Sequence, residues 1–260
     1  MLWVYPVMVT GPSSNGYLGH RHHTSGLGER SMIKKQDGIA LNASTKTKKD
    51  SRIRRQNMEA IISAAEDEFV SHGYKGATIQ AVADKAGLPK ANVLYYFKHK
   101  SDLYYEVLAR ILDLWNSSFD HVTPENDPAD AIANYIRSKM ELSRLYPKAS
   151  KIYASEIIHG APYLSQYLKQ THADWTNQRA KVIQKWIDQG KLKAVDPHHL
   201  LFLIWGATQH YADFSAQTTK VLGREMDKTE FELATEMLIE IILTGCGIDT
   251  AGVLKKKKGD

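Results

Sequence analysis

Apolar residues recur at spacings of three and four along nearly the whole chain from Arg52 to Leu243, and this periodicity limits the possible folds more than any other feature. Individual periodic stretches close at Gly or Pro, as at Gly73, Pro147 and Gly190. Alternating apolar and polar residues, which would indicate strands, are nearly absent. The sequence therefore predicts an all-α protein. Its apolar runs are shorter than the roughly 18 residues of a membrane-spanning helix, so we expect no membrane partner.

Composition and charge narrow the class of protein further. The 260 residues include 43% apolar and 24% charged side chains, as in folded globular proteins. Residues 46–100 carry a net charge of +5, whereas residues 101–250 carry −5. The basic segment is therefore expected to meet a polyanion such as DNA. The single cysteine, Cys246, excludes an intramolecular disulfide and a four-cysteine zinc site, and it is consistent with a cytoplasmic location.

Both ends of the chain lack the pattern of a packed helix. Residues 1–45 are rich in Gly, Ser, Asn and His, and we assign them to a disordered extension. The apolar segment Met1–Val9 has no basic residue before it, so we do not interpret it as a signal peptide. The histidines of His20–His23 lack the spaced partners of a metal site. Residues 251–260 are assigned to a basic disordered tail.

Two short helices joined by a tight turn are predicted between Thr78 and Phe97. Thr78 is a good N-cap, and Gly87 stands where a left-handed residue would end the first helix. Pro89 fits the first turn of a second helix, because the missing N–H has no helical partner there. A helix that opens with small and polar residues can enter the major groove of DNA, which is about 12 Å wide. The pair is therefore typical of a helix-turn-helix.

Basic residues flank these two helices and indicate contacts with DNA phosphates. Lys98, His99 and Lys100 follow the second helix, beside the N-terminus of the next one, where anions are favoured. Six basic residues precede the helix that leads into the pair: Lys46, Lys48, Lys49, Arg52, Arg54 and Arg55. From this pattern alone, an ordinary helical hairpin with a solvated basic face remains an alternative.

Residues 55–103 resemble the TetR family of transcriptional regulators, whose members carry a three-helix DNA-binding head. The residues that carry the resemblance are Phe69, Gly73, Thr78, Ile79, Ala83, Ala86, Gly87, Tyr95, Tyr96, Phe97 and Lys100. One departure is Pro89, where the family often has Ser or a similar cap. We therefore assign residues 46–100 to a DNA-binding domain of this type.

By position, the resemblance implies which side chains meet DNA. Base edges would be contacted by Lys90, Ala91 and Asn92. Phosphates would be contacted by Thr78, Tyr95, Tyr96 and Lys100. Core packing is the alternative for two of the aromatic residues; we favour it for Phe97, and it stays open for Tyr95.

Residues 101–250 are predicted to form a helical effector-binding and dimerisation domain. We expect six helices: Ser101–Phe119, Ala129–Leu145, Pro147–His159, Tyr163–Gln189, Asp196–Ala216 and Thr229–Leu243. The last two are rich in large apolar residues and could form a four-helix bundle in a twofold homodimer, as in the TetR family, although filling the monomer's core is an alternative. A dimer would place two reading helices about 34–36 Å apart on a pseudo-palindromic double-stranded operator.

A small-molecule site is indicated by Trp205 and Gln209, which stand four residues apart and share a helix face. A large ring beside a carboxamide suits a planar ligand that stacks and forms paired hydrogen bonds. Trp115 could add a second wall, while Tyr211 lies on another face of the same helix. From spacing alone, core packing of Trp205 is the favoured interpretation.

Several segments are similar to the RutR-type regulators of pyrimidine catabolism, a branch of the same family. These segments are Ile111–Trp115, Gly160–Pro162, Gly190–Leu192, Asp196–His198 and Ile204–Phe214. The resemblance implies that uracil or thymine is the effector and that its binding releases DNA. It also implies Trp115, Trp205 and Gln209 as ligand residues, with Tyr211 less directly matched.

Catalysis is not expected from this sequence. It has no spaced catalytic triad, no HExxH motif and no Gly-rich phosphate loop. Glu156 and His159 have the spacing of di-iron bundles, but no second copy occurs. We therefore expect a ligand-responsive repressor of TetR type without cofactor or metal. The alternatives are a regulator of this type with a different effector and an effector-free DNA-binding protein.

Overall fold

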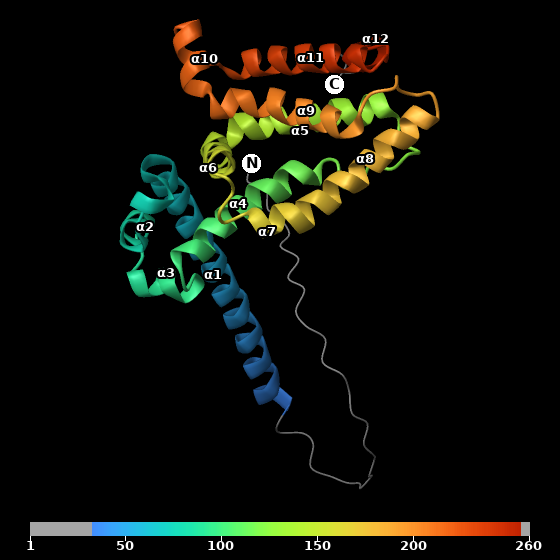
Figure 1. Cartoon of the computed structure of the whole chain (residues 1–260). Coiled ribbons are helices and arrows are strands. Elements are labelled where there is room, and N and C mark those ends of the chain that lie inside the picture. Colours follow the sequence, from blue (N-terminus) through green and yellow to red (C-terminus); the bar gives the residue numbers. More distant parts are fainter. Residues whose placement is uncertain (1–32, 256–260) are drawn as a thin grey trace. The chain divides into compact units, whose positions relative to one another are not determined.

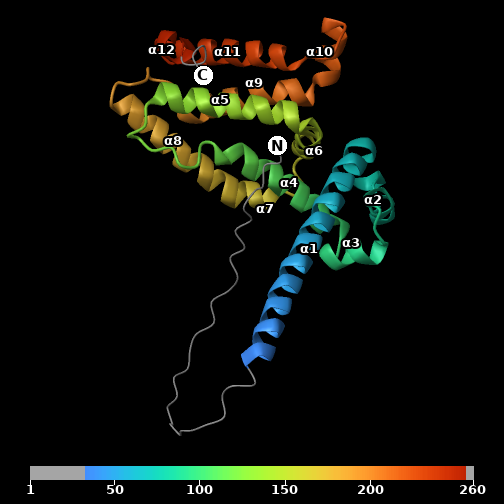
Figure 2. The same cartoon turned by 180° about the vertical axis from the view of Figure 1, so that it is seen from behind.

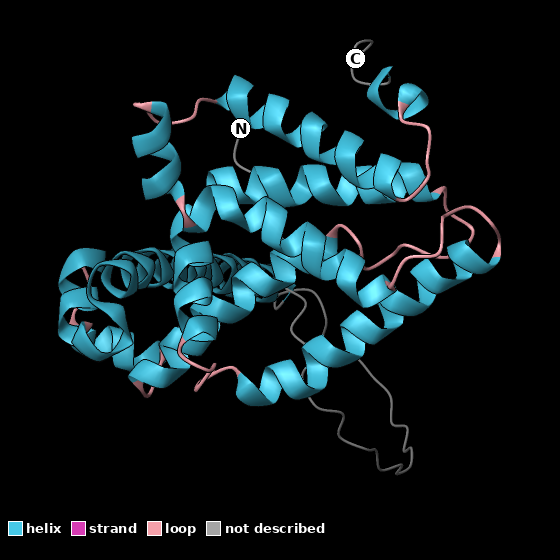
Figure 3. Cartoon of the chain, turned by 45° about the horizontal axis from the view of Figure 1, so that its top comes forward, coloured by secondary structure: helices cyan, strands magenta, loops and turns pink. Residues whose placement is uncertain are grey.

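A computed structural model of the chain describes residues 33–255, with side chains from residue 51 to residue 254 (Figure 1). Every regular element in this range is a helix, as the periodicity predicts (Figure 3). Within the same range, no helix is long and apolar enough to cross a membrane. The expectations for the N-terminal segment Met1–Val9, for His20–His23 and for most of the basic tail concern residues outside those described.

The chain divides into two compact units, Met1–Ser51 and Arg52–Asp260, which are described separately. The described part of the first unit is the beginning of helix α1 (Ile33–Gly76). Residues 33–45 are part of this helix, whereas the sequence analysis assigned them to a disordered extension. The segment has few Gly or Pro residues but no apolar face, so helical periodicity could not reveal it.

In the second unit, three helices form the head predicted from the sequence: the end of α1, α2 (Ile79–Ala86) and α3 (Lys90–Tyr96). The backbone of α1 breaks at Gly73, whose φ of 63° suits only glycine without strain. Thr78 caps α2, since its Oγ1 accepts a hydrogen bond from the N–H of Ala81 at 3.1 Å. Gly87 ends α2 with a φ of 66°, as predicted. Pro89 is the N-cap of α3 rather than a residue of its first turn.

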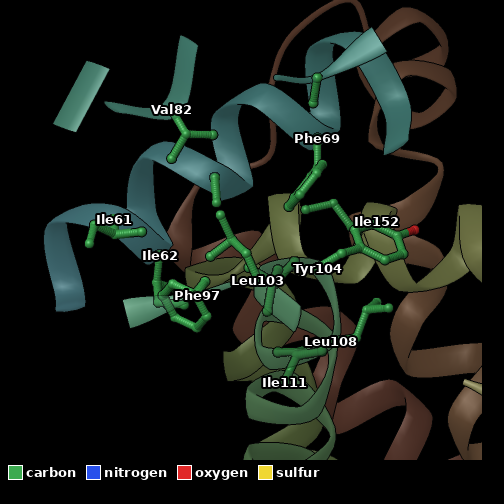
Figure 4. Close-up of a cluster of buried hydrophobic side chains, with 14 of the residues drawn as sticks. Ile61, Ile62, Phe69, Val82, Phe97, Leu103, Tyr104, Leu108, Ile111 and Ile152 are labelled. Atoms are coloured by element: carbon green, nitrogen blue, oxygen red, sulfur yellow. The ribbon is translucent and has the colours of Figure 1, made fainter. Parts of the chain in front are cut away.

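The head is held together by one apolar core that continues into the next helix (Figure 4). Ile61, Val82 and Val93 bring the three head helices together in it, each at most 1% exposed. Phe97 is also buried, as expected. Leu94, next to the buried Val93, is 40% exposed.

Lys100 ties the end of α1 to α4 (Lys100–Ser117). Its ammonium donates hydrogen bonds to the carbonyl oxygens of Tyr74 at 2.6 Å and Ala77 at 2.9 Å. It also lies 4.5 Å from the centre of the Tyr74 ring. These carbonyls belong to the end of a helix, where backbone acceptors lack helical donors. The N-cap of α4 is His99, whose N–H donates to the Asp102 carboxylate at 3.0 Å, so the helix begins one residue before the expected Ser101.

Replacing Lys100 with Met is expected to lower the free energy of unfolding by about 2–3 kcal/mol, because it leaves part-buried carbonyl oxygens without a charged donor. Urea denaturation measures the loss. Lys98→Met is the matched control, since Lys98 is exposed. Equal denaturation midpoints for the two variants would contradict the role assigned to Lys100.

The body is built around α5 (Pro128–Leu145), which packs against both α9 (Pro197–Asp213) and α11 (Lys228–Gly245) (Figure 2). The core between them includes Tyr135 and Ile239, both fully buried. The remaining helices are α6 (Pro147–Ile158), α7 (Ser165–Tyr167), α8 (Ala173–Asp188), α10 (Ser215–Leu222) and α12 (Ala251–Lys255).

Two of the expected body helices are interrupted. The stretch expected as one helix over Tyr163–Gln189 contains a π-helical turn, η1 (Leu168–His172), between α7 and α8. The helix expected to run from Asp196 to about Ala216 is capped by the Asp196 carboxylate but ends at Asp213, and α10 follows after Phe214. Neither interruption contains Gly or Pro, so neither could be predicted from helix-breaking residues.

Candidate DNA-binding surface and ligand cavity

The start of α3 presents three small or polar side chains to solvent. Lys90, Ala91 and Asn92 are all exposed, as a helix that enters a DNA groove requires. The next residue, Val93, is completely buried and fixes the orientation of the helix. The turn before α3 is closed by a hydrogen bond of 3.0 Å from the N–H of Leu88 to the carbonyl oxygen of Ala83.

The four residues assigned to phosphates lie in different environments. Thr78 is exposed, and Tyr95 is 75% exposed, which excludes core packing for Tyr95. Tyr96 is partly buried and packs against the head core. The ammonium of Lys100 donates to the backbone carbonyls of Tyr74 and Ala77, which gives it a structural role, and its contact with a phosphate stays a prediction.

The basic residues before the head are divided between the two units. Arg52 is exposed at the start of the second unit. Lys46, Lys48 and Lys49 lie in the helical backbone of α1 in the first unit, and their side chains are outside those described. Their contact with phosphates stays a prediction.

A small cavity lies inside the body. It is lined by Leu112, Trp115, Asn116, Tyr135, Lys139, Tyr153, His172, Trp205 and Gln209. Three of the four predicted ligand residues are therefore brought together from α4 and α9. Tyr211 is the exception: its ring packs against Phe231 of α11, with 6.0 Å between ring centres. Since Trp205 and Gln209 share one face of α9, a residue two positions later points elsewhere.

Lys139 brings a positive charge to the cavity. Its side chain is 1% exposed, and its Nζ lies 4.1 Å from the centre of the Trp115 ring. Burial lowers the pKa of Lys139 to about 7, although the nearby Asp213 carboxylate acts in the opposite direction. None of the nine residues that line the cavity is acidic.

Two polar atoms in the cavity lining are buried without a hydrogen-bond partner. They are Nε1 of Trp115 and Nδ1 of His172. By contrast, Nε1 of Trp205 donates to the Tyr135 hydroxyl at 2.8 Å. Burial and the charge of Lys139 lower the pKa of His172. Unpartnered buried polar atoms are uncommon in folded proteins, and two in one cavity indicate a place for a polar ligand.

The sequence analysis missed Lys139 and His172. A signal for Lys139 was present, because it lies on the same helix face as the buried residues Ile132, Tyr135 and Ile136. A charged residue at a position expected to be buried is unusual unless it has a function. His172 closes the π-helical turn η1, and such turns are frequent at functional sites but have no sequence signature.

The cavity is nearly closed. Its volume is about 20 Å³, which is room for about one water molecule. Trp205 and Gln209 are partly exposed, so they lie at its border with solvent. A planar six-membered ring can enter only if lining side chains move outward.

Comparisons with known proteins cover almost all of the second unit. Residues 61–107 match the family described as bacterial regulatory proteins, tetR family, and residues 108–249 match the family described as YcdC-like protein, C-terminal region. The chain is 40% identical to the HTH-type transcriptional regulator RutR of Escherichia coli K12 over 200 residues, which are 76% of this chain and 94% of RutR. It is 21% identical over 145 residues to the uncharacterized HTH-type transcriptional regulator YhgD of Bacillus subtilis, covering 55% of this chain and 76% of YhgD.

Solved structures share the fold at lower sequence identity. AibR in complex with isovaleryl coenzyme A and operator DNA superposes with a TM-score of 0.54 at 16% identity, covering 71% of this chain and 97% of AibR. A transcriptional regulator from Rhodococcus sp. Rha1 gives a TM-score of 0.53 at 19% identity, covering 74% of this chain and 98% of that protein. Both support a helical head followed by a helical body.

Proposed function

The chain belongs to the TetR family of transcriptional regulators, and from this premise we propose that it is a repressor whose homodimer leaves its operator when uracil or thymine binds in the body. The relatives are regulators of transcription and not enzymes, in agreement with the sequence analysis. We keep residues 46–100 as the DNA-binding domain and residues 101–250 as the effector and dimerisation domain.

Operator recognition is assigned to the start of α3. Lys90 can donate to guanine, and Asn92 can form paired hydrogen bonds with adenine. Ala91 leaves room for a close approach. Phosphate contacts are assigned to Thr78, Tyr95 and Tyr96, and to the basic residues that precede the head. The net charge of +5 over residues 46–100 supports this orientation toward DNA.

Dimerisation is assigned to the outer faces of α9 and α11. Leu233, Met237 and Ile241 recur every four residues on α11 and are 49–67% exposed. Phe202 and Leu203 of α9 are 50% and 57% exposed. So many exposed large apolar side chains on two helices are typical of a protein–protein interface. A second copy of the chain, related by a twofold axis, would cover them.

The cavity supports a planar pyrimidine as effector. Uracil carries two N–H donors and two carbonyl acceptors on a flat ring. The unpartnered Nε1 of Trp115 can donate to a carbonyl, and the Gln209 carboxamide can pair with an N–H and a carbonyl together. The observation that carries this proposal is the pair of unpartnered buried atoms, on Trp115 and His172, in a cavity that also contains Trp205 and Gln209.

An effector-free DNA-binding protein is the second candidate. The observation in its favour is the cavity volume of about 20 Å³, which leaves no room for a ring without rearrangement. The two candidates differ in whether the dimer binds a pyrimidine at all, and they can be separated in solution.

Isothermal titration of the dimer with uracil and with thymine is expected to give saturable binding. Trp205→Ala should weaken it by about 1–3 kcal/mol, since the variant loses a stacking surface. Tyr211→Ala is the matched control on the same helix, because Tyr211 does not line the cavity. If neither pyrimidine binds to an intact dimer, the effector assignment is wrong and the effector-free candidate is favoured.

A further inference from the structure

Lys139 is a buried basic residue in a cavity whose other lining residues have aromatic, aliphatic or amide side chains. It belongs to α5, its side chain is 1% exposed, and none of the other lining residues carries a carboxylate. Lysine is almost never fully buried in proteins unless an opposite charge pairs with it. Burial of its charged form therefore costs stability unless an acceptor faces it.

The charge that favours the protonated form of Lys139 comes from Asp213. One oxygen of that carboxylate, Oδ1, accepts a hydrogen bond of 2.5 Å from the Ser150 hydroxyl. Burial also raises the pKa of Asp213, which weakens its negative charge. Asp213 is not among the residues that line the cavity. On the cavity side, the Lys139 ammonium can therefore donate a hydrogen bond to a ligand.

The neighbours of Lys139 define what such a ligand must present. The ammonium lies over the Trp115 ring, 4.1 Å from its centre, and the unpartnered Nε1 of Trp115 belongs to the same ring system. An ammonium and an indole N–H are donors only. A ligand edge that faces them must therefore carry acceptors, and a second donor there would leave buried donors unpaired.

We propose that Lys139 determines the specificity of the cavity: it selects planar nitrogen heterocycles that present a carbonyl or enolate oxygen to α5 and rejects those that present an amino group at that edge. This inference rests on the proposed function, because it assumes that a pyrimidine enters the cavity. It narrows the effector class to rings of the uracil type and excludes aminopyrimidines of the same size, such as cytosine.

Uracil and cytosine are compared because they have rings of the same size: in cytosine an amino group replaces the C4 carbonyl and N3 carries no hydrogen. A site that is built to hydrogen-bond one group discriminates strongly against an analogue that lacks it, because its own polar groups are then unpaired. We expect the unaltered dimer to bind uracil at least about 100-fold more tightly than cytosine in isothermal titration. This measurement needs no variant.

Lys139→Met removes the ammonium and its hydrogen-bond donors but keeps a side chain of similar length. We expect it to weaken uracil binding by about 10- to 100-fold and to reduce the preference over cytosine to within about threefold. Lys185→Met, at an exposed position on α8, is the matched control and should behave as the unaltered protein.

The stability of the same variants provides a second readout. If Lys139 served only the fold, its replacement would lower the urea midpoint. We expect the midpoint of Lys139→Met to be unchanged or higher, because an unpaired buried charge is removed.

The outcomes separate the two proposals. Loss of selectivity in Lys139→Met with retained stability supports the inference. Tight uracil binding with the same selectivity in Lys139→Met as in the unaltered dimer overturns it and leaves the proposed function standing. Equal affinity of the unaltered dimer for uracil and cytosine also overturns it. If an intact dimer binds none of these rings, both proposals fall.

Discussion

Replacing Ile241 with Glu is expected to convert the dimer to a monomer and to reduce operator affinity by at least about 10³-fold. Ile241 is 59% exposed on α11, in line with Leu233 and Met237. In a twofold interface each substitution occurs twice, so two carboxylates would be buried without partners, at several kcal/mol each.

The loss of DNA affinity follows from the loss of bivalency. One short reading helix meets a single half-site, whereas a dimer engages two, and the second contact is intramolecular. Light scattering after size exclusion measures the oligomeric state. Fluorescence anisotropy with an operator selected by the unaltered protein measures the affinity.

Ile158→Glu provides the matched control for this experiment. Ile158 is 76% exposed on α6, outside the proposed interface, so its replacement should leave a dimer with full operator affinity. If Ile241→Glu remains a dimer at micromolar concentration, the interface lies elsewhere.

The second large effect is expected from Asn92→Ala in α3. A bidentate contact from a side chain to a base discriminates by about 1–3 kcal/mol. The dimer binds with two copies of α3, so the substitution removes the contact from both half-sites. We expect the binding free energy for a symmetric operator to fall by about 2–6 kcal/mol. Asn92 is exposed, so stability should not change.

The type of loss is as informative as its size. Removal of a base contact should relax the preference at one position of each half-site, whereas removal of a phosphate contact should weaken all sequences alike. Anisotropy titrations against operators substituted at single positions distinguish these results. Asn177→Ala, at an exposed position on α8, is the matched control. An unchanged base preference in Asn92→Ala would contradict the proposed orientation of α3.

The head could be predicted from the sequence because its signals are local. The cap of α2 at Thr78 and its end at Gly87 each depend on side chains within a few residues. Lys100 shows the limit of such reasoning. Its position beside a helix N-terminus suggested a phosphate contact, but backbone carbonyls more than 20 residues earlier bind its ammonium. Only the packing of α1 against α4 reveals that partner.

The cavity could be predicted in part for the same reason. Their spacing on one helix placed Trp205 and Gln209 on a shared face, but only the family resemblance favoured these two residues and Trp115 as ligand residues. Lys139 and His172 come from two further elements, so no spacing rule relates them to the others. The π-helical turn that carries His172 adds to the difficulty, because it changes the phase of a helix without changing its composition.

The hydrogen bonds between Lys100 and the end of α1 affect how the head can move. The end of α1, α2, α3 and the first turns of α4 share one apolar core, and the Lys100 ammonium joins α1 to α4 by hydrogen bonds. The head is therefore expected to be rigid. A metabolite signal that reaches α4 must then reorient the whole head as a rigid body instead of loosening α3 alone. Effector binding would then change the orientation of the head relative to DNA, while the DNA-contacting surface of α3 keeps its structure.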